Sequence, residues 1–467
     1  MRKTFRWFAV ALLTAGLLAA CSTVEDAATL EAQKKGSAAP ATYLIVTEGT
    51  LAANLPAVAA ANRDEVRRFY PDAGFASVVT TNPNAYRRFG TVTRDVTVQW
   101  IEPGRQVALD IEYANPPFSG DDDPLFDLQW GHDAVNAPEA WNAGVRGAGV
   151  RVAVLDTGFD LDHPDLAPNI DLDSSEDFTG EGLQYALADS FSHGTHTAGT
   201  VAAADNAFGT IGVAPEAELV LVKVLGDEGS GAFEWVMSGI VHAADVDADI
   251  INMSLGALMY KSGYWTEDSE GNDVFVTARE VQELRTAMQR VIRYATQQGT
   301  LVVASAGNSA IDFDHAADLI TLPGSASGVV TVGATAPNGW ATDPQNAFLD
   351  YLASYSNYGR SHVDFAAPGG DAAYPGNENC LIGGLVRACW VFDLVFSTGN
   401  GGWYWSGGTS MAAPHVAGVA ALILSEFGGS GSMTPAQLEA ELRARADDLG
   451  QPGNDPVYGK GRVATGY

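Results

Sequence analysis

Residues 150–158 read VRVAVLDTG, an apolar run of strand length that ends in Asp-Thr-Gly. Similar apolar runs follow at Leu219–Leu225, Ile250–Met253, Leu301–Ala304 and Val329–Val332, and stretches rich in small residues separate them. Strands this apolar are buried on both faces, most often in a parallel sheet that helices cover. The pattern therefore predicts an α/β fold, a parallel β-sheet with helices on both of its faces.

Polar residues follow the carboxyl ends of several predicted strands, where open parallel sheets bind their ligands. DTG at 156–158, SLG at 254–256 and GN at 307–308 each follow an apolar run. Two further segments begin predicted helices and carry His193 and Ser410. An Asp, a His and a Ser at one sheet edge would supply the carboxylate, base and nucleophile that acyl transfer requires.

Three motifs give these residues a family resemblance. DTG at 156–158, HGTHTAG at 193–199 and GTSMAAPHVAG at 408–418 resemble the signatures of the subtilisin-like serine proteases, peptidase family S8. They occur in the order Asp, His, Ser, which differs from the orders in chymotrypsin and in α/β-hydrolases. The resemblance covers roughly Gln129 to Gly461 and implies the three-layer subtilisin-like fold.

The resemblance implies a role for each catalytic candidate. Ser410 would attack the peptide carbonyl, and His193 would accept its proton and pass it to the leaving amine. Asp156 would hold His193 in the required tautomer and stabilise its charged form. Asn308 would donate its side-chain amide to the oxyanion, together with the backbone N–H of Ser410.

Each motif also has a purely structural interpretation. DTG after an apolar run is commonly a turn, and Gly307-Asn308 alone is compatible with a left-handed turn. His193 and His196 have the i, i+3 spacing of a metal pair, but the HExxH glutamate is missing. We expect His196 and His415 to be structural residues.

Two segments resemble the strands that flank a bound peptide in this family: Gly229-Ser230-Gly231 and Ser254-Leu255-Gly256. Backbone pairing of this kind binds extended peptides, and pockets for alternate side chains set the preference. The walls of the first pocket, 254–256 and 304–307, carry no acidic residue, which favours an apolar or aromatic residue before the cut bond. The segment 257–298 is longer than the family core requires, and we expect WTEDSEGND at 265–273 to be a solvated loop.

The stretch ADNAFGT at 204–210 occupies the position of the family's calcium loop. The ligands that the resemblance implies are the side chains of Asn206, Asp165 and Gln129 and the carbonyls of Ala204, Phe208 and Thr210. All of them are oxygens, which suits a hard cation. A metal-free turn of the same sequence is the alternative.

Residues 43–113 predict a small α+β unit before the catalytic domain, which we place at 129–467. We expect a strand at Tyr43–Val46, a helix over Leu55–Tyr70 and a strand over Val92–Ile101. The unit resembles the inhibitor-type propeptide of these proteases, which assists folding and is then removed. We expect the cut between Asp110 and Phe126, around the processing linker at 114–128.

The chain begins with a predicted export signal over residues 1–21. Positive residues precede an apolar stretch too short to span a membrane, and LAAC at 18–21 resembles a bacterial lipobox with Cys21 as the lipidated residue. An ordinary secretory signal is the alternative, and residues 22–42 form a flexible spacer. Export places Cys380 and Cys389 in an oxidising compartment, where we expect a disulfide rather than idle thiols.

The composition of the chain argues against two classes of protein, nucleic-acid-binding proteins and wholly disordered proteins. The chain has 467 residues, with Lys+Arg 26 and Asp+Glu 57, and its net charge of −31 argues against a nucleic-acid partner. A hydrophobic fraction of 46% excludes wholesale disorder.

We therefore expect an exported serine endopeptidase made as a zymogen, with structural Ca²⁺ and no catalytic cofactor. Its expected partners are protein or peptide substrates, its own propeptide and, through the lipid on Cys21, the membrane until maturation releases it. The alternatives are a lipid-anchored binding or scaffold protein with an inactive fold, and an esterase that uses the same triad.

Overall fold

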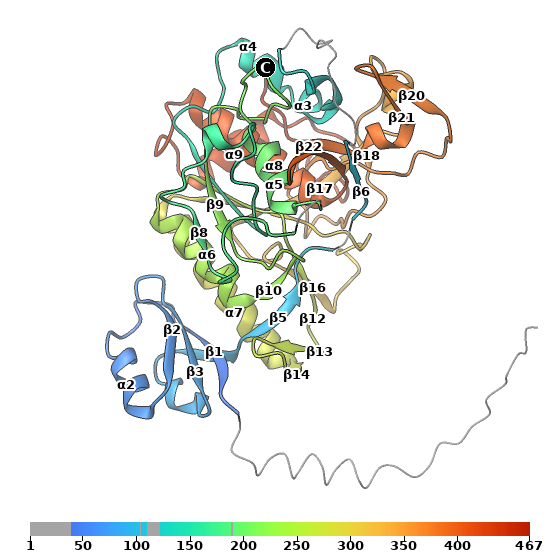
Figure 1. Ribbon diagram of the computed structural model, residues 1–467. Helices are drawn as coiled ribbons and strands as arrows, with labels where there is room; N and C mark the ends of the chain where they lie inside the picture. Colours follow the sequence, from blue (N-terminus) through green and yellow to red (C-terminus); the bar gives the residue numbers. More distant parts are fainter. Residues whose placement is uncertain (1–38, 103, 110–121, 188–189) are drawn as a thin grey trace, which may run out of the picture. The chain divides into compact units, whose positions relative to one another are not determined.

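The computed structural model describes residues 39–102, 104–109, 122–187 and 190–467 (Figure 1). The predicted signal peptide with Cys21, most of the spacer and much of the processing linker lie outside the described residues. The chain divides into two units, residues 1–40 and 41–467, and every described helix and strand belongs to the second. None of the described helices is long and apolar enough to cross a membrane.

The N-terminal part of the second unit is a small α+β structure with an antiparallel sheet of order β2-β3-β1-β4. Its elements are β1 (Ala41–Val46), α2 (Leu55–Asn62), β2 (Glu65–Tyr70), β3 (Phe75–Thr80), η1 (Pro83–Tyr86) and β4 (Thr91–Arg94). Ile45, Leu55, Val78 and Tyr86 are buried in a separate apolar core between the sheet and the helices. We call residues 41–109 the N-terminal segment.

The predicted helix over Leu55–Tyr70 is wrong in its second half. The helix ends at Asn62, because Arg63 adopts a left-handed conformation with φ 63°. Glu65–Tyr70 then forms β2 and pairs antiparallel with β3. Its branched and aromatic residues favour strands, and the pairing places them on a half-buried sheet.

The central sheet has the strand order β18-β17-β15-β11-β7-β9-β8, with β19 paired to β17. Its strands are β7 (Arg151–Asp156), β8 (Glu176–Asp177), β9 (Glu218–Lys223), β11 (Ile250–Met253), β15 (Leu301–Ser305), β17 (Val329–Ala336), β18 (Tyr351–Leu352) and β19 (Phe365–Pro368). The five apolar runs of the sequence form five of these strands, and they pair in parallel. Ile250, for example, lies opposite Val152 on one side and Leu301 on the other.

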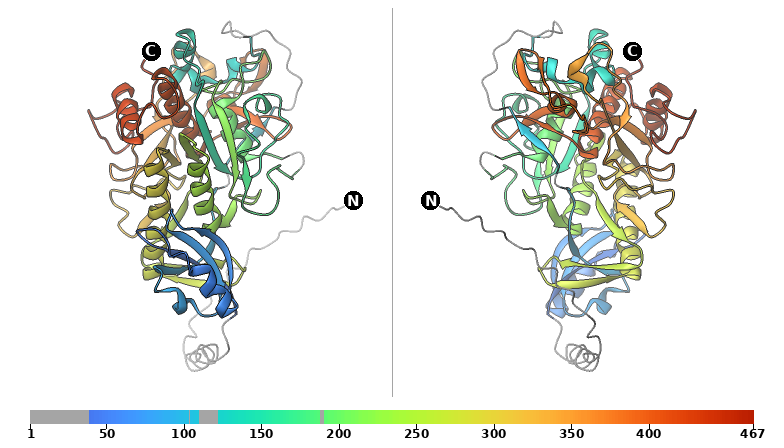
Figure 2. Two further views of the ribbon diagram at one scale, coloured as in Figure 1. Left: turned by 90° about the vertical axis from the view of Figure 1, so that its left-hand side faces the viewer. Right: turned by 90° about the vertical axis from the view of Figure 1, so that its right-hand side faces the viewer.

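Helices cover both faces of this sheet (Figures 1 and 2). They are α3 (Trp130–Ala134), α4 (Ala137–Asn142), α5 (His193–Ala202), α6 (Phe233–Asp245), α7 (Ala278–Gln298), α8 (Thr409–Glu426) and α9 (Pro435–Arg445). Val152 and Val154 of β7 are buried in one apolar cluster with residues of α5 and α8, whereas Ala153 and Leu155 are buried with residues of α6 and α7. The three-layer α/β fold expected from the sequence is confirmed.

Smaller sheets surround this framework. Their strands are β5 (Val96–Gln99), β6 (Gln106–Ala108), β10 (Ser230–Ala232), β12 (Ala257–Tyr260), β13 (Gly263–Asp268), β14 (Asp273–Thr277), β16 (Leu319–Leu322), β20 (Asn379–Ile382), β21 (Leu385–Ala388), β22 (Val395–Gly399) and β23 (Gly402–Ser406). One of them, of order β10-β5-β13-β14, contains a strand of the N-terminal segment. We call it the mixed sheet.

Three other expectations can be compared with the structure. The predicted strand over Val92–Ile101 is divided into β4 and β5 at Asp95. The stretch 265–273, expected to be a solvated loop, is mostly the β13–β14 hairpin with its turn. Cys380 and Cys389 are joined by a disulfide, with a Cα–Cα distance of 4.9 Å.

Candidate active site

Asp156 and His193 meet at the carboxyl end of the central sheet. Asp156 is the last residue of β7 and is fully buried. His193 is the first residue of α5, whose N-terminus is capped by Ser192 Oγ accepting from the Thr195 N–H at 3.1 Å. His193 Nδ1 lies 2.8 Å from Asp156 Oδ1 and 3.0 Å from Oδ2. A proton on Nδ1, shared with the carboxylate, leaves Nε2 as the basic nitrogen.

The close approach of α5 to β7 depends on Gly194. A Cβ atom at this position would lie 2.9 Å from the Thr157 carbonyl oxygen and 2.9 Å from Cε1 of Phe159. Any side chain there would push the first turn of α5 away from the strand. The glycine of the HGTHTAG motif therefore has a packing reason, which is to keep His193 beside Asp156.

Ser410 is the second residue of α8, where unpaired backbone N–H groups and the helix dipole favour negative charge. Its Oγ donates to the Ser254 carbonyl at 3.1 Å, and Ser254 Oγ donates to the Ser410 carbonyl at 2.6 Å. Among the described residues no hydrogen bond joins Ser410 to His193. Such bonds commonly tighten only in the substrate complex, so the arrangement is compatible with a nucleophile and its base.

The side-chain amide of Asn308 has a fixed orientation. Its Oδ1 accepts from the Thr409 N–H at 2.9 Å and from Thr409 Oγ1 at 2.8 Å, which leaves Nδ2 as a free donor. An atom at the Cβ position of Gly408 would lie 3.5 Å from Asn308 Nδ2 and 3.6 Å from Ser410 N. Two N–H donors thus face one small space that the absent side chain of Gly408 leaves open, a geometry that can hold an oxyanion.

The two other histidines of these motifs occupy structural positions. His196 Nε2 lies 3.0 Å from the Tyr404 carbonyl, and burial lowers the pKa of His196 to about 3. His415 Nδ1 lies 2.8 Å from the Met411 carbonyl, and burial lowers the pKa of His415 to about 4. Both rings stay neutral at physiological pH.

The two segments predicted to flank a bound peptide flank the protein's own N-terminal segment. On one side β10 pairs antiparallel with β5, and the Gly229 carbonyl accepts from the Trp100 N–H at 3.1 Å and the Ile101 N–H at 3.2 Å. On the other side the Gly256 N–H donates to the Trp100 carbonyl at 2.8 Å. Residues 97–101 therefore lie as an extended strand between 229–231 and 254–256.

The chain continues past the candidate site on the other side. β6 pairs antiparallel with β23, with Gln106 opposite Ser406, four residues before Ser410. Glu102, Gln106 and His193 line one common pocket. The N-terminal segment thus approaches the candidate triad at Glu102 and leaves it at Gln106. Sequence analysis did not foresee this path, because no local motif records which strand edges the segment will find.

The predicted calcium loop surrounds Asp165. Asp165 Oδ2 accepts from Thr210 N at 2.8 Å, Thr210 Oγ1 at 3.0 Å and Trp403 Nε1 at 2.9 Å, whereas the buried Oδ1 has no hydrogen-bond partner among the described residues. Burial raises the pKa of Asp165 to about 6. An oxygen buried in this way is suited to a cation.

The structure does not place Gln129 as a free ligand. Its Oε1 accepts from the Ile211 N–H at 3.0 Å, and its Nε2 donates to the Ile211 carbonyl at 2.8 Å. Both ends of the amide are therefore engaged by the backbone at the end of the loop. Gln129 braces the loop, and its sequence position alone could not show this.

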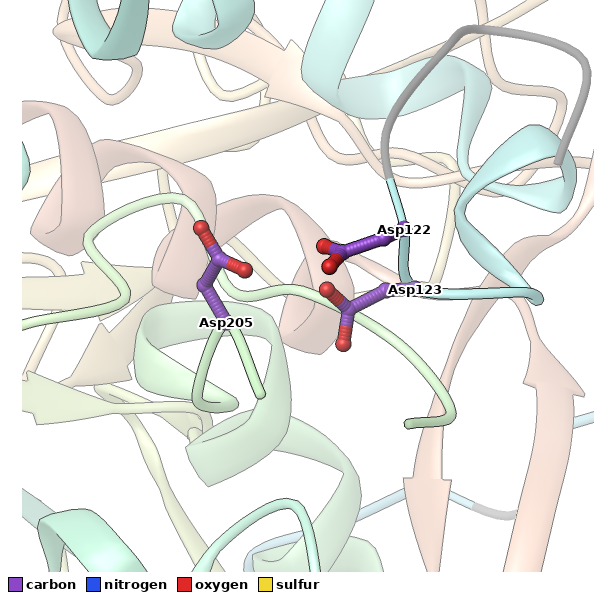
Figure 3. A group of neighbouring side chains, drawn as sticks. All are labelled: Asp122, Asp123 and Asp205. Atoms are coloured by element: carbon purple, nitrogen blue, oxygen red, sulfur yellow. The ribbon is translucent and has the colours of Figure 1, made fainter. Parts of the chain in front are cut away.

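Three carboxylates that were not predicted as ligands lie together at this loop: Asp205 belongs to the loop, and Asp122 and Asp123 lie beside it. Oxygen atoms of Asp122, Asp123 and Asp205 lie within 4.8 Å of one another, with the two neighbouring aspartates facing Asp205 (Figure 3). Asp123 is fully buried, and its Oδ1 accepts from the Phe208 N–H at 3.1 Å. The run of aspartates at 121–123 is typical of an exposed linker in the sequence, and only the fold shows that Asp122 and Asp123 lie at the loop.

Known proteins resemble this chain in sequence and in structure. A sequence model described as the subtilase family matches residues 147–461. The chain is 36% identical over 337 residues to an intracellular serine protease of Paenibacillus polymyxa, a match that covers 70% of this chain and 84% of that protein. It is 35% identical over 338 residues to subtilisin E of Bacillus subtilis (strain 168), covering 72% of this chain and 70% of that protein.

Two solved structures are also similar. A lanthipeptide protease matches with a TM-score of 0.56 and 29% identity, over 73% of this chain and 94% of that chain. The epidermin leader peptide processing serine protease from Staphylococcus aureus matches with a TM-score of 0.66 and 22% identity, over 92% of this chain and 97% of that chain. At that identity the second likeness concerns the fold alone.

Proposed function

Because the chain belongs to the subtilase family and is a serine endopeptidase, we propose that it is exported and made as a zymogen whose own N-terminal segment fills its peptide cleft. One observation carries this proposal: residues 97–101 lie between the two segments expected to bind substrate, and Ile101 lines one pocket with His193. An inactive scaffold protein is not favoured, because the relatives described above are proteases.

In the proposed reaction Ser410 Oγ attacks the peptide carbonyl carbon while His193 Nε2 takes the hydroxyl proton. Asp156 keeps the proton on Nδ1 and stabilises the imidazolium that forms. The negative oxygen enters the space at Gly408 and accepts hydrogen bonds from Asn308 Nδ2 and Ser410 N. His193 then gives its proton to the leaving amine, and water hydrolyses the acyl-enzyme by the same steps in reverse.

The N-terminal segment acts as an intramolecular inhibitor in this proposal. Trp100 is buried against Phe233, with ring centroids 4.7 Å apart, and its Nε1 donates to the Gly231 carbonyl at 2.9 Å. Arg68 pairs with Glu234 at 3.1 Å and Arg94 with Asp268 at 2.9 Å. These contacts hold the strand in the cleft that a substrate would need.

The path of the segment also suggests where maturation begins. Glu102 and Gln106 line one pocket together with His193, so we propose a first cut between them. This position precedes the predicted window between Asp110 and Phe126, which remains a prediction for later trimming.

We further propose that a calcium ion stabilises the catalytic part. Asp165 and the loop 204–210 would hold it, with the carboxylate of Asp123 in place of the amide of Gln129. The buried, partnerless Oδ1 of Asp165 supports this assignment. The ion would supply only structural charge compensation, and no step of the reaction depends on it.

The intact mass of the full-length precursor tests the function. The wild-type protein should lose the residues up to the Glu102–Gln106 segment, and Ser410→Ala should stay uncut, because only the variant lacks the nucleophile. Ser425→Ala is the matched control, since Ser425 lies on the same helix and donates to Ala148 O. The wild-type protein and Ser425→Ala should hydrolyse a denatured protein, and Ser410→Ala should not.

Two outcomes would contradict the proposal. Equal trimming of the wild type and Ser410→Ala would show that another protease matures the chain, and hydrolysis by Ser410→Ala would exclude Ser410 as the nucleophile. Fractionation of the same samples tests the proposed lipid on Cys21: the precursor should be found in membranes and the mature part released from them. A mature part that stays in membranes without the N-terminal segment would contradict release.

A further inference from the structure

The β13–β14 hairpin lies in the part of the chain, 257–298, that is longer than the family resemblance requires. It joins the mixed sheet through β5, with Glu267 opposite Thr97 and Asp268 opposite Val96. Thr266 Oγ1 also donates to the Thr97 carbonyl at 2.8 Å. Strand β5 therefore has β10 along one edge and the inserted hairpin along the other.

The side chains of β5 alternate in the way that a recognised strand requires. Val96 and Trp100 are each 1% exposed, and Val98 packs against the same apolar cluster, whereas Gln99 is exposed. Val276 of β14 belongs to that cluster. The hairpin thus supplies apolar contact as well as hydrogen bonds.

A pocket beside Val96 extends this contact to the surface. It is lined by residues of the hairpin and of β4 and β5, among them Val96, Trp265, Phe275 and Val276. The rings of Trp265 and Phe275 pack edge to face with centroids 5.5 Å apart, although the two residues are 71% and 47% exposed. Exposed aromatic pairs beside a pocket are typical of binding surfaces.

We propose that the β13–β14 hairpin is a second peptide-binding edge of the mature enzyme. The inference rests on the proposed function and names the substrate class: extended polypeptide with an apolar residue at the position of Val96. Both β10 and β13 belong to the catalytic part, so removal of β5 leaves two strand edges one strand apart. Unpaired edges of this kind add an extended peptide as a strand.

A second substrate preference, for a basic residue, is expected at the position of Arg94, two residues before the position of Val96. Arg94 Nη1 lies 2.9 Å from Oδ2 of Asp268, whose side chain is fully buried. Asp268 also accepts from the backbone of Asn272 at 2.8 Å, so the turn of the hairpin holds the carboxylate in place. A substrate with a basic residue at the position of Arg94 would meet the same carboxylate.

Two peptides of the chain's own sequence test the inference on enzyme matured from the full-length precursor. The long peptide reproduces residues 94–109 and the short peptide 98–109, so both contain the proposed cut. We expect kcat/KM to be about tenfold or more higher for the long peptide, because it alone reaches the hairpin. Aspartate at the Val96 position of the long peptide should remove this advantage.

A matched pair of enzyme variants assigns the effect to the hairpin. Thr266→Val removes the hydroxyl that bonds the peptide and should reduce the preference for the long peptide about fivefold. Thr286→Val removes a hydroxyl that donates to Gln282 O at the same distance, 2.8 Å, within α7 and should leave the preference unchanged.

The possible results separate this inference from the proposed function. Equal kcat/KM for the two peptides, or an equal loss in both variants, would overturn the hairpin's role while leaving the protease intact. Hydrolysis of neither peptide would count against the proposed function instead. Binding of the two peptides to the same matured enzyme would then decide the inference, and equal affinities would overturn it.

Discussion

The central sheet and the mixed sheet are both built from paired strands, but they differ in where their strands come from. All strands of the central sheet lie between Arg151 and Pro368, within the catalytic part. In the mixed sheet, β5 comes from the N-terminal segment and separates β10 from β13. Removal of that segment leaves the central sheet complete and takes a middle strand out of the mixed sheet.

This difference assigns separate roles to the two sheets: the central sheet positions the candidate catalytic residues, and the mixed sheet binds the strand that lies in the cleft. The candidate triad and the candidate oxyanion donors lie near the ends of β7 and β15 and on helices packed on the central sheet, so the proposed maturation should leave them in place. The mixed sheet decides what occupies the cleft. Substitutions at the candidate catalytic residues on the central sheet should change the rate of the reaction. Substitutions in the mixed sheet should change which peptides bind in the cleft.

The largest expected effect comes from Asn308→Leu, at one of these candidate catalytic residues. The leucine cannot donate to the oxyanion, so kcat for a peptide substrate should fall about 10²–10³-fold while KM stays within a small factor. Steady-state kinetics on the mature enzyme measure both constants.

Asn346→Leu is the matched control, because Asn346 is exposed and bonds only Asp343. The comparison between the two sheets predicts one further result: Asn308→Leu should not change how fast the cut N-terminal segment leaves. A faster release in that variant would contradict the proposed division of roles between the two sheets.

Five strands of the central sheet, β7, β9, β11, β15 and β17, could be predicted from the sequence because they are apolar on both faces. VRVAVL at 150–155 cannot remain exposed, and its burial fixes both the parallel pairing and the covering helices. The same argument fails for Glu65–Tyr70, where charged and apolar residues mix and pairing with β3 decides the structure. Local pattern predicted a helix there, and a long-range contact overruled it.

The candidate site could be predicted where its residues carry local signals. Asp156, His193, Ser410 and Asn308 each follow a strand or begin a helix beside small residues, which the sequence displays directly. The carboxylates of Asp122 and Asp123 lie beside the predicted calcium loop, about 80 residues further along the chain, and the hairpin pairs with β5 across a still longer stretch of chain. Such meetings depend on the whole fold, so no short pattern could show them.

Calcium removal should affect stability in the catalytic part alone. An ion present at 100 times its dissociation constant stabilises a protein by about 2.7 kcal/mol, so for a catalytic domain of this size chelation should lower Tm by roughly 4 °C. Thermal unfolding with and without a chelator measures the shift. Asp165→Asn should abolish the response, whereas Asp173→Asn, at an exposed carboxylate, should keep it. A response that persists in Asp165→Asn would contradict the proposed ligand.

The smallest expected effect concerns the pH dependence of release from the mixed sheet. Asp95 is fully buried between β4 and β5, and its Oδ1 accepts from the Glu234 N–H at the start of α6 at 3.1 Å. Burial raises the pKa of Asp95 well above its usual value, and the nearby Glu234 carboxylate raises it further. The segment is therefore held most tightly when Asp95 is protonated.

The sign of the pH effect follows from this linkage. Once released, Asp95 returns to its ordinary pKa, so the bound state takes up a proton and weakens as pH rises through the raised pKa. Asp95→Asn keeps the hydrogen-bond acceptor without the charge. It should slow release more at pH 8 than at pH 5, because the wild-type carboxyl must take up a proton to be bound and the amide need not.

Release is measured as the delay before peptide hydrolysis appears in a maturing sample at the two pH values. Asp72→Asn is the matched control, because Asp72 lies in the same segment with an exposed side chain. If Asp95→Asn instead speeds release at both pH values, the charged carboxylate at the α6 N-terminus stabilises the bound segment more than its burial costs. Charge on Asp95 would then stabilise the binding of β5 in the mixed sheet, as the Arg68–Glu234 and Arg94–Asp268 ion pairs do for the N-terminal segment. A protonated, neutral Asp95 would not be the form that binds most tightly.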